Sequence, residues 1–209
     1  MTPKPSTASK VFLVDDDASV RRALTRLLRS AGYEVKPFAS AREFLDNAKD
    51  EGPACLVLDI RMPGLSGIDL QRELQATNAI LPIIFITGHG DIPTSVKAMK
   101  AGAVDFLRKP VKDHDLLKAI EQALTRATRE RAKREELEAI QSRVDSLTPR
   151  ERQVLEHVVA GQLNKQVAYD LGTVEKTIKV HRARVMDKMG VASLAELVRL
   201  AERAGIGKM

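Results

Sequence analysis

The stretch Val11-Phe12-Leu13-Val14-Asp15-Asp16-Asp17 sets the pattern that decides the fold, because an apolar run ends there in acidic residues. Residues 19–31 follow with apolar side chains at helical spacing, and Gly32 then stops the predicted helix. A short apolar run that leads into an amphipathic stretch is typical of a parallel strand and its helical crossover. The opening therefore predicts the first strand and helix of an α/β domain.

The same pattern recurs up to residue 125, where five strand and helix pairs fit. The predicted strands are Val11–Asp15, Glu34–Phe38, Ala54–Asp59, Pro82–Thr87 and Val104–Arg108. The first, third and fourth are continuously apolar, which indicates strands that are covered by helices on both faces. We therefore predict an open, doubly wound, five-stranded parallel sheet, a fold that binds ligands at its carboxyl edge.

Beyond Pro110 the pattern becomes purely helical, and residues 113–146 contain neither Gly nor Pro. This composition predicts one long helix or two abutting helices. Four apolar residues have a 3-4-3 spacing that could pack on a partner helix: Leu137, Ile140, Val144 and Leu147. Residues 125–136, in contrast, are charged and weakly amphipathic. A coiled coil and a flexible, solvated linker both remain open.

A second domain begins at Leu147-Thr148-Pro149-Arg150-Glu151. Thr148 is a predicted helix N-cap, proline takes the first helical position, and Glu151 completes a capping box. Apolar periodicity and breaks at glycines predict four short helices, near 149–160, 164–171, 174–189 and 193–204. The predicted organisation is a disordered start at 1–10, a first domain at 11–125, a linker helix at 126–146 and an all-α domain at 147–209.

Composition limits the partners and the compartment. Residues 148–209 hold 11 basic and 7 acidic side chains, whereas residues 11–125 are nearly neutral. A basic C-terminal segment fits a polyanion partner, although solvated helix faces could give the same excess. Cys55 is the only cysteine, which excludes an intramolecular disulfide and favours a buried thiol in a reducing compartment. Without an apolar stretch of about 18 residues, we expect a soluble, cytoplasmic protein with no membrane partner.

Carboxylates follow two of the predicted strands. Asp15, Asp16 and Asp17 come after the first strand and Asp59 ends the third, so they converge at one edge of a doubly wound sheet. Carboxylates this close repel one another unless a divalent cation that prefers oxygen ligands lies between them. Single acidic residues are common in turns, but four at this spacing favour a Mg²⁺ site.

Thr87 and Lys109 stand at the ends of the fourth and fifth strands and would join the same edge. A carboxylate nucleophile, a metal, a lysine charge and a hydroxyl donor are together what in-line phosphoryl transfer to an aspartate requires. The edge therefore indicates phosphoryl chemistry.

At these residues the sequence resembles the CheY-like, flavodoxin-like receiver domains of response regulators, over roughly residues 10–125. The motifs are Val14-Asp15-Asp16-Asp17, Leu58-Asp59-Ile60-Arg61-Met62-Pro63-Gly64, Ile86-Thr87-Gly88 and Phe106-Leu107-Arg108-Lys109-Pro110. The resemblance implies Asp59 as phosphoacceptor, with Thr87 and Lys109 on the phosphoryl group. It also implies Mg²⁺ bound among Asp15, Asp16, Asp59 and the backbone carbonyl of Arg61, and a cis peptide before Pro110.

The resemblance further implies a rotameric switch at Thr87 and Phe106. Phe106 stands where the family commonly has tyrosine, so its inward swing would be driven by apolar burial and not by a new hydrogen bond. A plain core position is the alternative for Phe106. The shifted face would be the fourth helix, fifth strand and fifth helix, with Lys97, Lys100 and Asp105, where active receivers of this family pair into two-fold dimers.

The predicted helices 164–171 and 174–189 are joined by a tight turn at Gly172-Thr173, the arrangement that places a second helix in the major groove of DNA. Several cations crowd that second helix: Lys176, Lys179, Arg182, Arg184 and Lys188. A solvated face would explain the charge alone. The turn that precedes it favours double-stranded DNA as the partner.

Residues 147–204 resemble the LuxR/NarL-type helix-turn-helix. The motifs are Leu147-Thr148-Pro149-Arg150-Glu151, Asn164-Lys165-Gln166-Val167-Ala168, Leu171-Gly172 and Val174-Glu175-Lys176-Thr177-Ile178-Lys179-Val180-His181. The resemblance implies that base edges are approached by Lys179, Val180 and Ala183. It implies phosphate contacts from Lys165, Thr177, His181 and Arg184, and we add Lys176 and Lys188 for their charge. His181 could equally be a simply exposed side chain.

Two features of this segment bear on how its helix-turn-helix would recognise a DNA sequence. Gly172-Thr173 departs from the commoner Gly-Ile or Gly-Val turn, and a polar residue there could loosen the packing. Val180 and Ala183 could read only thymine methyl groups, so specificity would rely on Lys179 and on DNA shape.

Together the two halves resemble the FixJ/NarL class of response regulators, which implies a transcription regulator and not an enzyme. We predict that a sensor histidine kinase phosphorylates Asp59, and that a phosphorylated homodimer binds DNA avidly and activates transcription, with RNA polymerase as a further partner. An aspartate-based phosphatase would use Asp15 and Asp17 and leave Asp59 without purpose. A decayed receiver with constitutive DNA binding is disfavoured by the intact site. Whether the unphosphorylated receiver masks the DNA-binding helix stays open.

Overall fold

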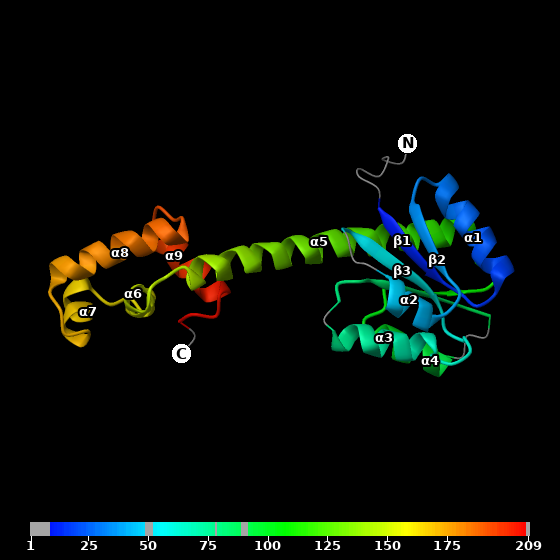
Figure 1. Cartoon of the computed structure of the whole chain (residues 1–209), viewed down its shortest axis with the longest axis horizontal. Coiled ribbons are helices and arrows are strands. Elements are labelled where there is room, and N and C mark those ends of the chain that lie inside the picture. The colour runs from blue at the N-terminus through cyan, green and yellow to red at the C-terminus, as the bar shows by residue number, and fades with distance from the viewer. Residues whose placement is uncertain (1–8, 49–51, 78, 89–91, 208–209) are drawn as a thin grey trace. The chain divides into compact units, whose positions relative to one another are not determined.

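The computed structural model describes residues 9–48, 52–77, 79–88 and 92–207 (Figure 1). The chain forms two compact units, Met1–Arg131 and Ala132–Met209. Of the segment 1–10, which the sequence predicts to be disordered, residues 1–8 lie outside the described residues, and Lys10 already belongs to the first strand. None of the helices in the described ranges combines the length and apolarity that crossing a membrane requires.

The first unit contains the predicted five-stranded parallel sheet, in the order β2-β1-β3-β4-β5. Its strands are β1 Lys10–Val14, β2 Glu34–Phe38, β3 Ala54–Asp59, β4 Ile83–Thr87 and β5 Asp105–Arg108. The prediction of a doubly wound α/β fold is confirmed, and each strand bound agrees to within one residue. In the sheet register Asp59 is opposite Ile86 and Thr87 is opposite Arg108, so the carboxyl ends of the central strands form one edge.

Five helices connect and follow these strands: α1 Ala18–Ser30, α2 Ala41–Asn47, α3 Gly67–Ala76, α4 Ile92–Lys100 and α5 Asp113–Asp145. The sheet has an apolar layer on each face. On one face Phe12 and Leu56 pack with residues of α2, α3 and α4, such as Phe44. On the other, Val11 and Cys55 pack with residues of α1 and α5. Alternate residues of β1 and β3 thus serve opposite layers, as strands covered on both sides require.

Cys55 lies in the second of these layers and is fully buried. Burial raises the pKa of its thiol to about 12. The expectation of a core thiol without chemistry agrees with this environment, because the thiolate is the reactive form.

The second unit contains the four predicted helices, which are α6 Pro149–Val159, α7 Asn164–Asp170, α8 Glu175–Met189 and α9 Leu194–Arg203. Val144 and Leu147, at and after the end of α5, are buried in the core of this unit. Leu137 is 38% exposed. The 3-4-3 spacing therefore does not form one continuous stripe for a partner helix, because its C-terminal half packs within its own domain.

The predicted capping box at the start of α6 is present. Thr148 Oγ1 accepts from the Glu151 N–H, and Glu151 Oε2 accepts from the Thr148 N–H at 2.9 Å. The same Glu151 oxygen lies 2.7 Å from Lys188 Nζ, which also donates to the Ser146 carbonyl at 3.0 Å. Lys188 therefore ties the C-terminal end of α8 to the beginning of α6.

Candidate metal centre and nucleic-acid interface

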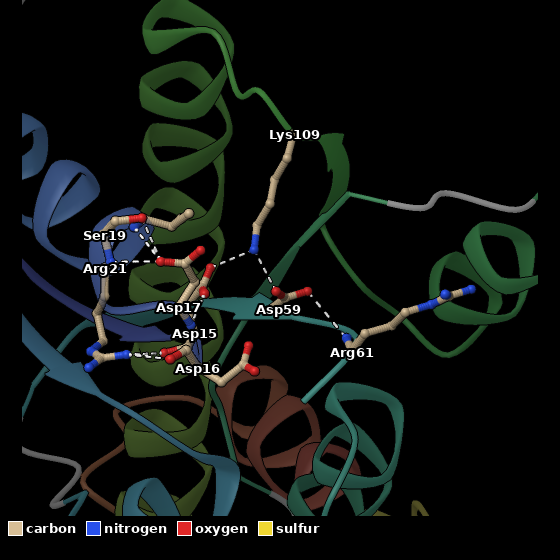
Figure 2. A network of polar contacts seen from close by, with 9 residues as sticks. Asp15, Asp16, Asp17, Ser19, Arg21, Asp59, Arg61 and Lys109 are labelled. Atoms are coloured by element: carbon tan, nitrogen blue, oxygen red, sulfur yellow. Dashed lines mark hydrogen bonds and ion pairs between the residues drawn. The ribbon is translucent and has the colours of Figure 1, made fainter. Parts of the chain in front are cut away.

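Three carboxylates meet at the carboxyl edge of the sheet (Figure 2). Ligand oxygens of Asp15, Asp16 and Asp59 all lie within 4.8 Å of one another. Asp15 is fully buried, Asp59 is 6% exposed, and Asp16 is exposed to solvent. The strand order produces this convergence, because β1 and β3 are neighbours and both end here.

Lys109 joins two of these carboxylates. Its Nζ lies 2.8 Å from Asp15 Oδ2 and 2.5 Å from Asp59 Oδ2. Burial lowers the pKa of Lys109, but its hydrogen bonds with Asp15 and Asp59 outweigh that effect, so the net pKa is raised. Burial raises the pKa of Asp15 in spite of the bond to Lys109. The ammonium is therefore charged at neutral pH, and it compensates the buried acidic pair only in part.

The remaining bonding capacity of the cluster suits a hard cation. Asp15 Oδ2 is buried, and among the described residues only the Lys109 ammonium, 2.8 Å away, compensates its charge. The carboxylate of Asp16 makes neither a hydrogen bond nor an ion pair within the described chain. Oxygen-only donors with unused lone pairs are what Mg²⁺ or Ca²⁺ prefers, so the residues present fit a divalent ion. The Arg61 N–H donates to Asp59 Oδ1 at 3.2 Å, which brings the Arg61 peptide beside the cluster.

Asp17 does not belong to this group, although the sequence suggested four converging carboxylates. Its Oδ1 accepts from the Ser19 N–H at 2.7 Å and from the Val20 N–H at 3.2 Å, as the N-cap of α1. The Ser19 hydroxyl bond is the main reason that the pKa of Asp17 is lowered. Helix capping therefore takes the third acidic residue away from the cluster.

Thr87 and Phe106, the predicted switch pair, have different surroundings. Thr87 ends β4 at the same edge as Asp59 and is 1% exposed. Phe106 lies in β5 and is half-buried against the layer that includes α4.

Sequence reasoning missed two residues at this edge. A Cβ on Gly67 would lie 2.3 Å from the Asp59 carbonyl oxygen, so only glycine lets α3 start this close to the strand end. Arg21, from α1, donates to the backbone carbonyls of Asp15 and Asp16. Gly67 could have been noticed in the sequence, because a glycine directly after a helix N-cap, here Ser66, indicates a close backbone approach. Arg21 could not, because contacts with backbone carbonyls leave no pattern in a sequence.

In the second unit the turn between α7 and α8 has the predicted form. Gly172 takes a left-handed φ of +63°, and the Thr173 N–H donates to the Ala168 carbonyl at 2.9 Å. The Arg182 guanidinium donates to Asn164 Oδ1 at 3.3 Å, and Arg150 donates to the Leu171 carbonyl at 2.5 Å. The two helices and the turn are thus held together by side-chain contacts as well as by packing.

The predicted DNA-contacting residues differ in accessibility. The exposed ones on α7 and α8 are Lys165, Lys176, Lys179, Val180, Ala183, Arg184 and Lys188. Thr177 and His181 are half-buried, and His181 Nδ1 is buried without a hydrogen-bond partner in the described ranges. Lys179 forms an exposed pair with Glu175 at 3.1 Å, which DNA phosphate could displace. Lys188 pairs at 2.7 Å with Glu151, whose side chain is buried, whereas the Glu175 partner of Lys179 is exposed.

A parallel sheet with an acidic edge, followed by a helix-turn-helix unit, is the architecture of a DNA-binding response regulator. Residues 11–121 match the family described as response regulator receiver domain, and residues 145–201 match the bacterial regulatory proteins of the luxR family. The chain therefore belongs to the two-component response regulators of the FixJ/NarL type.

Individual relatives match almost the whole chain. Nodulation protein W of Bradyrhizobium diazoefficiens is 51% identical over 96% of this chain and 88% of its own length. Transcriptional regulatory protein FixJ of the same organism is 46% identical over 96% of this chain and 98% of its own length. The structure of the response regulator StyR is 51% identical, covers 94% of this chain and 100% of its own, and has a TM-score of 0.85.

Proposed function

We propose that this response regulator is switched on by phosphorylation of Asp59 by a sensor histidine kinase, and that the phosphorylated receiver dimerises and places two helix-turn-helix units on DNA. The observation that carries this proposal is the set of three carboxylates with Lys109 bridging Asp15 and Asp59. These residues combine a carboxylate nucleophile at Asp59, oxygen ligands for a cation and the Lys109 ammonium at one edge of the sheet.

The proposed reaction is an in-line displacement at phosphorus. An oxygen of Asp59 forms the new P–O bond while the P–N bond to the kinase histidine breaks, and the histidine nitrogen takes up a proton as it leaves. Mg²⁺, held by Asp15, Asp16, Asp59 and the Arg61 carbonyl, would neutralise charge on the phosphoryl oxygens. The Lys109 ammonium, now paired with the Asp59 carboxylate, would transfer its hydrogen bond to a phosphoryl oxygen.

The proposed switch follows from the new charge. The Thr87 hydroxyl turns toward the phosphoryl group, and the half-buried ring of Phe106 moves into the space it leaves. The affected face includes α4, where Val96 is 45% exposed and Met99 is 44% exposed beside Lys97 and Lys100. Exposed apolar side chains within a charged rim support this face as the dimer surface.

For DNA we propose base contacts from Lys179, Val180 and Ala183. Phosphate contacts are proposed for Lys165, Lys176, Thr177, His181 and Arg184. We leave Lys188 out of this set, because its ion pair with Glu151 gives it a structural role. The bound dimer would contact RNA polymerase and activate transcription, which an in vitro transcription assay with and without phosphorylation tests.

The deciding experiment measures solution mass by light scattering, with Mg²⁺ and beryllofluoride as the phosphoryl mimic. Wild-type protein is expected to dimerise, whereas Asp59→Asn protein and wild-type protein without Mg²⁺ stay monomeric. If wild type stays monomeric while its DNA affinity rises, phosphorylation acts by unmasking the DNA-binding helix. If the Asp59→Asn protein is already a dimer, receiver-driven dimerisation is contradicted.

A further inference from the structure

The carboxylate of Asp16 needs an orienting residue. Asp15 is fixed on several sides, because its Oδ1 accepts from the Asp17 N–H at 2.9 Å and its Oδ2 pairs with Lys109. Asp59 is held by Lys109 and by the Arg61 N–H. Asp16 has no such side-chain contact with any described residue. The direction of its carboxylate is therefore set by the backbone that carries it.

Arg21 contacts that backbone on both sides of Asp16. Its Nη1 donates to the Asp15 carbonyl at 2.6 Å and to the Asp16 carbonyl at 3.2 Å, and Figure 2 shows the side chain folding back from α1 to reach them. The Asp15 carbonyl belongs to the peptide plane before the Asp16 Cα, and the Asp16 carbonyl to the plane after it. Holding both planes restricts φ and ψ of Asp16, and with them the direction of its Cβ.

We propose that Arg21 is a positioning residue of the metal site. By binding the carbonyls of Asp15 and Asp16, Arg21 holds the backbone that directs the Asp16 carboxylate toward Mg²⁺. This inference rests on the proposed function. Arg21 is half-buried, so its guanidinium is partly withdrawn from water at the base of the β1–α1 loop. Contacts that orient a metal ligand commonly change metal affinity by about 10-fold to 100-fold when removed.

The charge of Arg21 makes the proposal testable, because a positioning role and a purely electrostatic role predict opposite changes in Mg²⁺ affinity when Arg21 is replaced. A guanidinium near a cation site repels Mg²⁺, so its removal by charge alone would tighten binding. If Arg21 acts by positioning, Arg21→Met protein binds Mg²⁺ more weakly. A merely structural role would lower stability without changing the affinity of the folded protein.

The experiment is calorimetric titration of the full chain with Mg²⁺, with Asp16→Asn protein as the background. Arg21→Met protein is expected to bind about tenfold more weakly than wild type. Arg22→Met, one residue along α1, is the matched control and should bind as wild type, because the Arg22 side chain is exposed and makes no hydrogen bond or ion pair with any described residue. Thermal melts without Mg²⁺ verify folding of each variant.

Arg21→Lys keeps the charge but cannot reproduce the planar guanidinium, so an intermediate, roughly threefold loss is expected. This variant also carries the test if Arg21→Met protein does not fold. Equal or tighter Mg²⁺ binding by the Arg21 variants overturns the proposal and leaves the proposed function standing. Wild-type binding no better than that of Asp16→Asn protein would instead overturn the metal site itself, and the positioning role with it.

Discussion

At the scale of single residues, Lys109 balances negative charge at the acidic edge of the receiver, because its ammonium contacts two carboxylates, one of which is fully buried. Lys109→Met would leave both acids uncompensated, and we expect a loss of about 2 kcal/mol in unfolding free energy without Mg²⁺. Added Mg²⁺ should recover part of the loss by supplying the missing charge. Urea unfolding, followed by fluorescence of half-buried Tyr33 in the same unit, measures both effects.

Lys112→Met is the matched control, because Lys112 is exposed and lies just beyond Pro110. Its unfolding free energy should stay within about 0.5 kcal/mol of wild type. Lys109→Met protein as stable as this control in the absence of Mg²⁺ would contradict the compensating role of the ammonium.

The sequence predicted those site residues that lie at strand ends, such as Asp59, Thr87 and Lys109, since parallel strands deliver their ends to one edge. It grouped Asp17 with the converging carboxylates but not with the metal ligands, and only the local backbone shows that this carboxylate caps α1. Arg21 was missed because its partners are carbonyl groups, which every residue has.

At the scale of elements, α8 begins at Glu175, and its N-cap residue, Val174, provides no side-chain cap. Val174→Thr supplies a side-chain oxygen that can accept from an N–H group of the first turn, and it should stabilise this helix by about 0.5–1 kcal/mol. Hydrogen exchange of the α8 amides should slow accordingly. Val174→Ala is the control without a capping oxygen, and equal slowing in both variants would exclude capping as the cause.

The contact between α6 and α8 has its own pH dependence. The hydrogen bond from Lys188, followed by that from the Thr148 N–H, lowers the pKa of Glu151 from 4.5 to about 2. A depressed folded pKa gives stability that is full above the unfolded value and is lost as pH falls from about 4.5 toward 2. The melting temperature of the second unit should fall over this range.

Glu151→Gln tests that assignment, since glutamine keeps the size but does not titrate. Its melting temperature should be lower at neutral pH and change less between pH 4.5 and pH 2 than that of wild type. A pH profile parallel to that of wild type would place the acid sensitivity in another group.

Strands and short helices were predicted to within a residue or two because each is bounded by apolar periodicity and a glycine or cap. The sequence did not reveal which part of the long helix α5 packs in which unit. Leu124 packs on the sheet and Val144 packs in the second core, yet both lie in one uninterrupted helical pattern. The division of the chain into two compact units, between Arg131 and Ala132, falls inside α5, where no sequence feature marks it.

At the scale of the whole molecule, the salt dependence of DNA binding separates two modes of activation. Each phosphate contact contributes about −0.9 to the slope of log affinity against log salt concentration. If phosphorylation joins two copies on DNA, the slope for beryllofluoride-treated wild type should be about twice that of Asp59→Asn protein. Unmasking alone would raise affinity by a constant factor at every salt concentration and leave the slope unchanged.

The place of Cys55 in the central strand has a practical consequence. This thiol is fully enclosed, and its pKa of about 12 keeps it protonated, so a thiol-specific dye can label it only when the sheet opens. When the dye concentration is high enough for labelling to outpace reclosing, the labelling rate of the unaltered chain reports the opening rate of the receiver. Because the chain has one cysteine, a second one introduced at the surface can be labelled selectively in the native state, with no cysteine removed beforehand.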